Sequence, residues 1–353
     1  MTTGGVEEKN KKKKTACVTG GNGYIAAALI KVLLEKGYAV KTTVRNPDDR
    51  AKNSHLKVLQ ALGPLEVYRA DLDAEGSFDD AVAGCDYAFL IAAPVNLTSD
   101  NPELLMMAWQ KDQIEPSLRG ILNVMMSCVK SGTVRRVVLT SSAGVVCIRP
   151  LEGDSHVLDE ESWSNLDYVT AEKPPIWGYV VSKVLVEKEA LRSAQENDIS
   201  MVSLCPVLIV GASPVSKVYT SVPAALSLLS GDEAAFEMLK CIEKTYGGVQ
   251  VVDLDDLCRA QLFVAETETA SGRYVCCGFN TTVVEMARFL ARNYPHYNVT
   301  NTDDGSGHLL EKPRVCLSST KLVREGFEFK VKTLDDTYDG LIKYGKTLGI
   351  LPW

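Results

Sequence analysis

Short runs of β-type residues alternate with longer amphipathic stretches through the first half of the chain. Candidate strands cover residues 15–19, 39–44, 65–68, 87–91, 134–140 and 201–204. Between them, apolar side chains recur every three or four positions, as at Ile25, Leu29 and Val32, and this spacing predicts helices over 23–36, 113–129 and 175–196. Strands that alternate with helices form βαβ units with right-handed crossovers, so the pattern predicts a parallel sheet.

The pattern becomes less regular after Pro206. Residues 249–252, 255–265 and 273–277 are a strand, a helix and a strand that are candidates for the main sheet. Residues 283–292 and 334–347 have the pattern of helices in a small lobe. We therefore expect a sheet domain over residues 14–206 and a lobe over 207–353 that returns segments to the sheet. Residues 1–13, rich in lysine, are expected to form a disordered basic tail.

Composition narrows the class of protein. Of the 353 residues 46% are hydrophobic and 24% are charged, as in ordinary globular proteins. The net charge of −7 provides no general attraction to nucleic acid or anionic membrane, and no apolar run approaches the roughly 20 residues that a membrane span needs. The ten cysteines form no C-x-x-C pair and, with four histidines, no zinc-type cluster. We expect reduced cysteines, no metal and a cytoplasmic location.

A glycine-rich turn follows the first predicted strand. The segment Gly20-Gly21-Asn22-Gly23-Tyr24-Ile25-Ala26 has the pattern G-x-x-G-x-x-A and opens a helix. Gly20 allows a sharp turn, Gly23 allows close approach of a pyrophosphate, and Ala26 allows the helix to pack near the sheet. A tight βα turn is the simpler explanation, but a strand before the turn and a helix after it favour dinucleotide binding. We therefore expect an α/β fold: a Rossmann-type doubly wound parallel sheet with a smaller, interleaved C-terminal substrate-binding lobe.

The residue after the second strand bears on the choice of cofactor. An NAD site places an acidic residue there to bind the ribose 2′-hydroxyl, whereas this chain has Arg45. An arginine binds a 2′-phosphate through forked, charge-assisted hydrogen bonds, and Lys52 is a candidate second charge. NADP(H) is therefore favoured over NAD(H), unless Arg45 is a solvated loop residue. Asp71 after the third strand is either a contact of the adenine amino group or a turn residue.

A second constellation points to proton transfer. Tyr179 and Lys183 form the pattern Y-x-x-x-K, which places both side chains on one face of a helix. A nearby ammonium lowers the pKa of a tyrosine, so Tyr179 is a candidate general acid. Ser141 and Ser142 follow the strand that ends at Thr140, and either hydroxyl would hold a substrate oxygen at this edge of the sheet. Local turn bonding is the alternative for both serines.

In this order along the chain, the three motifs resemble those of the extended short-chain dehydrogenase/reductases. The chain is most similar to the plant flavonoid group, which contains dihydroflavonol reductase and anthocyanidin reductase. The matching stretches are 69–72, 91–94, 139–143, 173–179 and 271–277. The last two, with residues 15–18, are more similar to the anthocyanidin reductases, and Cys147 stands where dihydroflavonol reductases usually have asparagine.

The resemblance implies the activity and the site. It implies NADPH-dependent double reduction of anthocyanidins to flavan-3-ols, with a small flavonoid as substrate and Ser142, Tyr179 and Lys183 as the catalytic residues. It implies that the following residues surround the cofactor, with Pro206 beside the nicotinamide: Gly20, Asn22, Gly23, Tyr24, Ile25, Arg45, Lys52, Asp71, Leu72, Ile91, Ala92, Ala93, Pro94, Tyr179, Lys183 and Pro206.

Two departures from the family bear on substrate choice. Residues 104–110, Leu-Leu-Met-Met-Ala-Trp-Gln, look like an apolar insert near the expected substrate entrance. Leu90 and Asn96 replace histidines that are common in related reductases. The sequence leaves open whether the insert alters the pocket, which anthocyanidin is preferred, the stereochemistry of the product and the oligomeric state.

Three other functions compete with anthocyanidin reduction. Dihydroflavonol 4-reductase or a related carbonyl reductase is the nearest alternative. A cinnamoyl-CoA-type reductase is more distant, because Pro174-Pro175-Ile176-Trp177 stands where those enzymes have an asparagine- and tryptophan-rich signature. A non-catalytic NADPH-binding redox sensor is the third, although a sensor would not need the Y-x-x-x-K pair.

Overall fold

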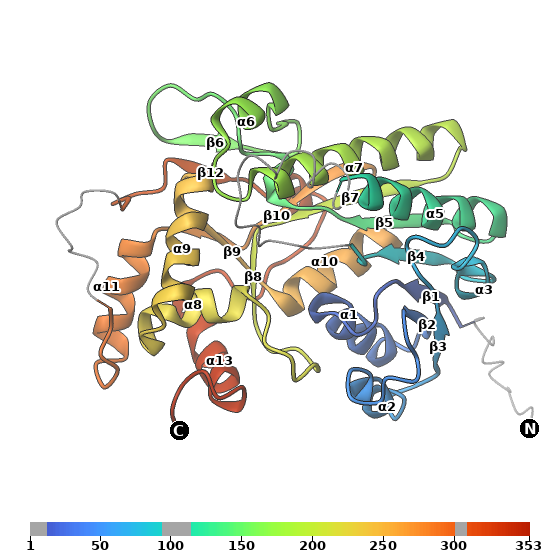
Figure 1. The fold of residues 1–353 in the computed structure, drawn as a ribbon, viewed down its shortest axis with the longest axis horizontal. Coiled ribbons are helices and arrows are strands. Elements are labelled where there is room, and N and C mark those ends of the chain that lie inside the picture. Colours follow the sequence, from blue (N-terminus) through green and yellow to red (C-terminus); the bar gives the residue numbers. More distant parts are fainter. Residues whose placement is uncertain (1–12, 94–113, 301–308) are drawn as a thin grey trace, which may run out of the picture.

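The computed structural model describes residues 13–93, 114–300 and 309–353. At its centre lies a seven-stranded parallel sheet with the strand order β10-β7-β5-β4-β1-β2-β3 (Figure 1). These strands are β1 Thr15–Val18, β2 Ala39–Val44, β3 Leu65–Arg69, β4 Tyr87–Leu90, β5 Arg136–Thr140, β7 Met201–Pro206 and β10 Gly272–Cys276. The order reverses between β1 and β4, which is where open α/β sheets bind ligands.

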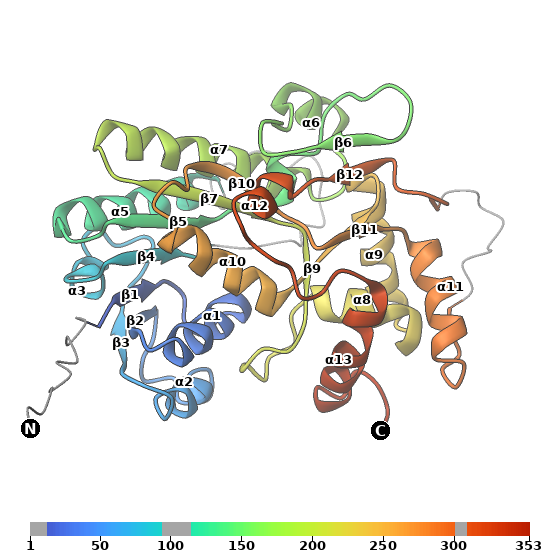
Figure 2. The same cartoon turned by 180° about the vertical axis from the view of Figure 1, so that it is seen from behind.

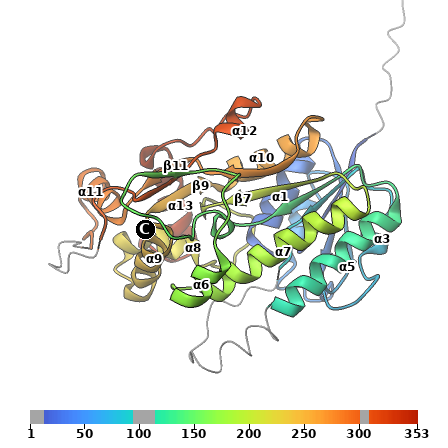
Figure 3. The same cartoon turned by 90° about the horizontal axis from the view of Figure 1, so that it is seen from above.

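Helices cover both faces of this sheet. Helices α1 (Tyr24–Glu35) and α10 (Leu254–Glu266) lie on one face, and α3 (Asp79–Val82), α5 (Glu115–Ser131) and α7 (Trp177–Glu196) lie on the other (Figure 3). Alternate residues of a strand point toward the helices on opposite faces of the sheet. In β1, Ala16 and Val18 belong to the buried cluster that includes α1, whereas Cys17 belongs to the cluster that includes α5. The expected α/β fold with a doubly wound parallel sheet is confirmed.

The segments after Pro206 divide between this sheet and a smaller one. Residues 273–277 do return to the main sheet, where β10 pairs with β7. The expectation that 249–252 belong there is wrong, because β9 (Val249–Asp253) pairs with β8 (Leu208–Val210) and β11 (Phe279–Thr281) in a three-stranded sheet. The physical reason is that β10 already occupies the open edge beside β7.

The lobe holds elements that the sequence pattern did not predict. Its helices are α8 (Ser221–Ser230), α9 (Glu233–Tyr246), α11 (Val283–Asn293) and α13 (Leu334–Thr347), grouped in Figure 2, and only the last two were expected. The remaining short elements are α2 Ser54–Leu59, η2 Ala143–Val145, β6 His156–Leu158, α6 Leu166–Glu172, β12 Val315–Leu317 and α12 Thr320–Arg324. Within the described ranges, no helix is long and apolar enough to cross a membrane.

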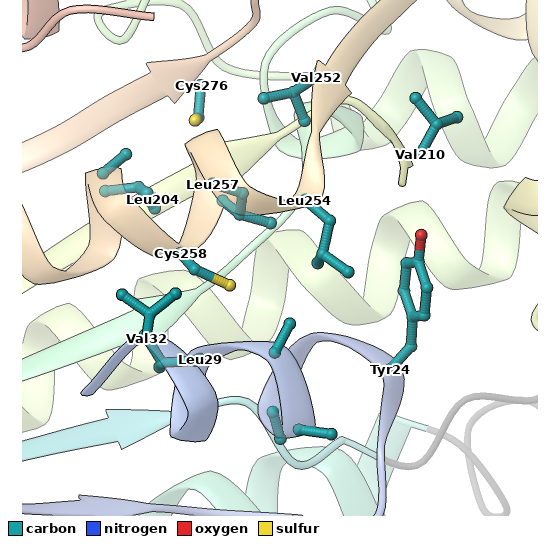
Figure 4. Close-up of a cluster of buried hydrophobic side chains, with 14 of the residues drawn as sticks. Tyr24, Leu29, Val32, Leu204, Val210, Val252, Leu254, Leu257, Cys258 and Cys276 are labelled. Atoms are coloured by element: carbon teal, nitrogen blue, oxygen red, sulfur yellow. The ribbon is translucent and has the colours of Figure 1, made fainter. Parts of the chain in front are cut away.

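One hydrophobic cluster joins the main sheet to the lobe. Leu29 of α1 packs in the same cluster as Leu257 of α10, Leu204 of β7 and Val252 of β9 (Figure 4). The cluster continues into α8 and α13 with Leu226 and Leu341. Burial of apolar side chains from both parts in one cluster stabilises their association. The main sheet and the lobe therefore depend on each other for their packing.

Candidate functional site

A cavity of about 840 Å³ lies at the carboxyl ends of the parallel strands and continues under the lobe. From the sheet it is lined by the turn after β1 and by the ends of β2, β3, β4, β5 and β7; from the lobe it is lined by residues of α8 and α9. A cavity of this size accommodates a cofactor-sized molecule and lies at the expected switch point of the sheet.

The turn after β1 has the geometry of an anion cradle. Gly20 has φ of +76°, and a side chain on Gly21 would place its Cβ 2.3 Å from Thr42 Oγ1, so both positions require glycine. Gly23 precedes α1 and donates its N–H to Gly20 O at 2.8 Å. Helix α1 has no side-chain cap and no acidic residue in its first turn, so its first N–H groups are left for an anion. A dinucleotide pyrophosphate fits this arrangement.

Two side chains that sequence analysis missed support the turn. His55 is buried and its Nε2 lies 3.0 Å from Gly21 O. Thr43 receives the N–H of Gly20 on its hydroxyl at 3.2 Å and the N–H of Gly21 on its carbonyl at 2.8 Å. These contacts join segments more than twenty residues apart, and no local pattern signals them.

The structure separates the two basic candidates for the 2′-phosphate. Arg45 lines the cavity at the end of β2. Lys52 is not among the lining residues; its side chain is 75% exposed and pairs with Asp49 at 3.1 Å. Asp71 lines the cavity, as a cofactor contact would, and also accepts the N–H of Asp73 at 3.1 Å, as a turn residue would. Arg45 is therefore the better placed cation.

The two serines after β5 point to different places. Ser141 donates to the buried carboxylate of Glu187, away from the cavity. Ser142 lines the cavity, and its Oγ accepts the N–H of Gly144 at 3.1 Å. The sequence alone left both hydroxyls open as substrate ligands. The structure brings Ser142 to the cavity.

Helix α7 carries the Y-x-x-x-K pair. Tyr179 lines the main cavity and also a small adjoining one of about 30 Å³, and Lys183 lines only the small one. The Lys183 ammonium lies 5.8 Å from the centre of the Tyr179 ring. The two side chains are therefore neighbours on one face of α7, as the i, i+4 spacing predicts.

The surroundings of α7 hold it in place. Glu187, on the buried side of the helix, pairs with Arg273 of β10 at 2.8 Å. The Arg273 guanidinium in turn lies 3.6 Å from the centre of the Trp163 ring. At the start of the helix, Ile176 lines the cavity with φ of +58°, a strained conformation for a β-branched residue. Such strain at a cavity wall is typical of functional sites.

The other residues that the sequence singled out, for the cofactor or for substrate choice, fall into three groups. The main cavity is lined by Gly20, Asn22, Gly23, Tyr24, Ile25, Leu72, Ile91, Ala92, Ala93 and Pro206. Leu90 is buried and lines the small cavity. Pro94, Asn96 and the insert at 104–110 lie outside the described residues.

The lobe supplies an apolar wall that sequence analysis missed. Met238, Ile242 and Tyr246 line the cavity from α9, each four residues from the next and hence on one helical face. That spacing is visible in the sequence, but because no helix was predicted at these residues, it did not indicate that they share one face. The cavity therefore joins the glycine-rich turn at one end to an apolar chamber beside Ser142 and Tyr179 at the other.

Comparisons with known proteins identify relatives of this chain. Residues 16–277 match the NAD dependent epimerase/dehydratase family. The chain is 46% identical over 339 residues to the (2S)-flavan-3-ol-forming anthocyanidin reductase of Vitis vinifera, covering 96% of this chain and 97% of that one. It is 40% identical to the dihydroflavonol 4-reductase of Callistephus chinensis, covering 98% and 90%.

A solved structure shows the same fold. The crystal structure of vestitone reductase from alfalfa is 32% identical, with a TM-score of 0.78, and the match covers 96% of this chain and all of that one. The match to the family profile and the likeness to full-length relatives extend over most of the sheet and the lobe. The chain therefore belongs to the NAD-dependent epimerase/dehydratase family, as an extended short-chain dehydrogenase/reductase with anthocyanidin reductases among its relatives.

Proposed function

We propose that the protein is an NADPH-dependent reductase of flavonoids that converts anthocyanidins to flavan-3-ols. The observation that carries this proposal is one continuous cavity with a pyrophosphate cradle at one end and Ser142, Tyr179 and an apolar chamber at the other. The likeness to anthocyanidin reductases, at up to 46% identity over nearly the whole chain, supports the choice of substrate class.

The proposed cofactor residues follow from the cavity wall. The first N–H groups of α1 would bind the pyrophosphate, Arg45 the 2′-phosphate, and Pro206 with residues 91–93 would border the nicotinamide end. Bound NADPH would supply one hydride, so the double reduction of an anthocyanidin would consume two NADPH in succession. Residues 14–206 would thus hold mainly the cofactor, and 207–353 mainly the substrate.

The proposed chemistry of the chain itself is proton delivery. The phenol of Tyr179 donates a proton to the substrate oxygen, and the Lys183 ammonium stabilises the phenolate that remains. Ser142 Oγ binds the same oxygen and fixes its position. A general acid placed in this way contributes roughly 10²–10⁴-fold in rate.

We also propose the cytoplasm as the compartment. All ten cysteines are unpaired, and eight of them are buried. Free thiols in this number are compatible with a reducing environment.

The direct test is an NADPH oxidation assay with product identification. Cyanidin, dihydroquercetin and a cinnamoyl-CoA thioester are offered in parallel. We expect cyanidin to be reduced to a flavan-3-ol. Exclusive reduction of dihydroquercetin at its carbonyl would identify a dihydroflavonol reductase instead, and NADPH binding without turnover of any substrate would favour a sensor.

The role of Tyr179 is tested by Tyr179→Phe. This variant keeps the ring but loses the proton, so we expect turnover to fall by about 10²-fold or more while NADPH still binds. Binding is measured by fluorescence titration and turnover by NADPH oxidation. If the variant keeps its turnover, Tyr179 is not the acid.

A further inference from the structure

Tyr246 is the last residue of α9 and lines the cavity on the lobe side. It follows Met238 and Ile242 on one helical face, but differs from them in carrying a hydroxyl. Gly247, with φ of +69°, ends the helix directly afterwards, and the Tyr246 carbonyl receives a hydrogen bond from Gln250 at 3.5 Å. The position of the ring over the cavity is therefore set by a defined helix end.

The Tyr246 hydroxyl lies close to that of Ser142. A methyl group placed on Gly144 would lie 3.4 Å from Ser142 Oγ and equally 3.4 Å from Tyr246 Oη. The two oxygens are therefore separated by no more than twice this distance, and Val180 Cγ2 lies 3.4 Å from the same point. Two hydroxyls from opposite parts of the chain face the same end of the chamber.

The Tyr246 hydroxyl differs from those of Tyr24 and Tyr219, which also line this cavity. Tyr24 donates to Gly211 O at 2.6 Å, and Tyr219 donates to Asn22 O at 3.1 Å. Across the described ranges, the Tyr246 hydroxyl has no hydrogen-bond partner. Because Tyr246 also lines the cavity, its unpartnered phenol is available to pair with a ligand there.

The phenol acts as a donor. Burial raises the pKa of Tyr246 well above its usual value, and the neighbouring phenol of Tyr179 and thiol of Cys147 act in the same direction. The group therefore stays neutral at working pH and retains its hydrogen. Tyr179 has Lys183 beside it, whereas no such cation is among the groups that perturb Tyr246. The two phenols are thus suited to different tasks.

We propose that Tyr246 is a specificity-determining residue, whose Oη donates a hydrogen bond to a second oxygen on the same edge of the substrate as the oxygen bound by Ser142. The inference rests on the proposed function and names the substrate feature that the site selects. That feature is a flat ring system with two oxygens along one edge. A substrate lacking the second oxygen loses this bond.

The test compares wild type with Tyr246→Phe on three substrates: cyanidin and its analogues lacking the 3- or the 5-hydroxyl. For cyanidin we expect kcat/KM to fall about 10-fold, since one hydrogen bond is lost. For the analogue that lacks the oxygen bound by Tyr246, wild type and variant should have equal kcat/KM. The NADPH dissociation constant should not change.

A matched control is Tyr338→Phe. The Tyr338 hydroxyl donates to Ala225 O at 2.7 Å inside the lobe, and Tyr338 does not line the cavity. We expect this variant to melt at a lower temperature but to keep kcat/KM within about 2-fold, because only a structural bond is lost. A loss in Tyr246→Phe that is equal for all three substrates would overturn the proposal, and so would an unchanged kcat/KM for cyanidin.

Failure of the proposed function would give a different result. In that case wild type reduces none of the three substrates, and Tyr246 is then tested by binding. Quenching of protein fluorescence by cyanidin is titrated with NADP⁺ present. About 10-fold weaker binding to Tyr246→Phe supports the recognition role, and equal binding contradicts it.

Discussion

Neighbouring residues at the end of β5 show how strongly side-chain direction decides function. Ser141 is bound to the buried carboxylate of Glu187, while Ser142 faces the cavity. Successive side chains of an extended segment point to opposite sides, so only one of the two serines can face the ligand. The same rule separates Cys17 from Ala16 and Val18 within β1.

Cofactor choice is a residue-scale prediction. Arg45→Asp places a carboxylate where the 2′-phosphate would lie, so we expect kcat/KM to fall at least 10-fold with NADPH and to rise with NADH. Lys52→Ala should cost much less, because Lys52 pairs with Asp49 and does not line the cavity. Steady-state kinetics with both cofactors measures the change. An equal loss with NADPH and NADH would contradict the role of Arg45.

At the scale of elements, α9 connects the cavity wall to the rest of the lobe. Its buried Glu243 accepts the N–H of Val283, at the start of α11, at 2.7 Å and that of Leu310 at 3.2 Å. Burial raises the pKa of Glu243 above its usual value, although these two hydrogen bonds act in the opposite direction. The folded state therefore binds the proton more tightly than the unfolded state does.

This difference in proton affinity predicts a pH-dependent stability. As pH rises from about 4.5 through the raised pKa, ionisation of Glu243 lowers the free energy of unfolding, and Glu243→Gln lacks this effect. The melting temperature of wild type minus that of the variant should therefore decrease between pH 5 and pH 8, by roughly 2 °C for each tenfold difference in proton affinity between the folded and unfolded states. Scanning fluorimetry at both pH values measures it. If the difference in melting temperature stays constant or increases with pH, burial does not dominate the pKa of Glu243.

At the scale of the whole molecule, the sheet and the lobe share one core. Strand β10 completes the sheet against β7, although more than sixty residues separate them along the chain. Helix α10 packs against α1, and Leu257 and Leu29 belong to the same buried cluster (Figure 4). The packing of the main sheet therefore continues beyond the end of β7 into the later part of the chain.

A truncation tests this dependence. A fragment of residues 1–206 would expose the edge of β7, which is buried along its length, and the apolar face of α1. We expect the fragment to aggregate or to melt without a cooperative transition, unlike the full chain. Circular dichroism melting and size-exclusion chromatography are the measurements. A cooperatively folding fragment that binds NADPH would show that the sheet part is independent.

Much of the fold and part of the site could be predicted because their signals are local. The period of apolar residues predicted the strands and helices of the sheet, and the glycine turn and the Tyr179–Lys183 pair were recognised from spacing within a few residues. Helix α8 was missed because it follows a run of small and turn-forming residues, and α9 was missed although the four-residue spacing of its apolar positions is visible in the sequence. His55 and Tyr246 were missed because their contacts join distant segments.

The sequence by itself determined the strand–helix alternation, the glycine-rich turn and the Tyr179–Lys183 pair, since each depends on residues adjacent in the chain or one helical turn apart. Only the tertiary structure decided that Ser142 rather than Ser141 faces the cavity, that Arg45 rather than Lys52 lines it, and that α9 closes it with a phenol. Those choices depend on which distant segments pack together, and packing is a property of the whole core rather than of any local pattern.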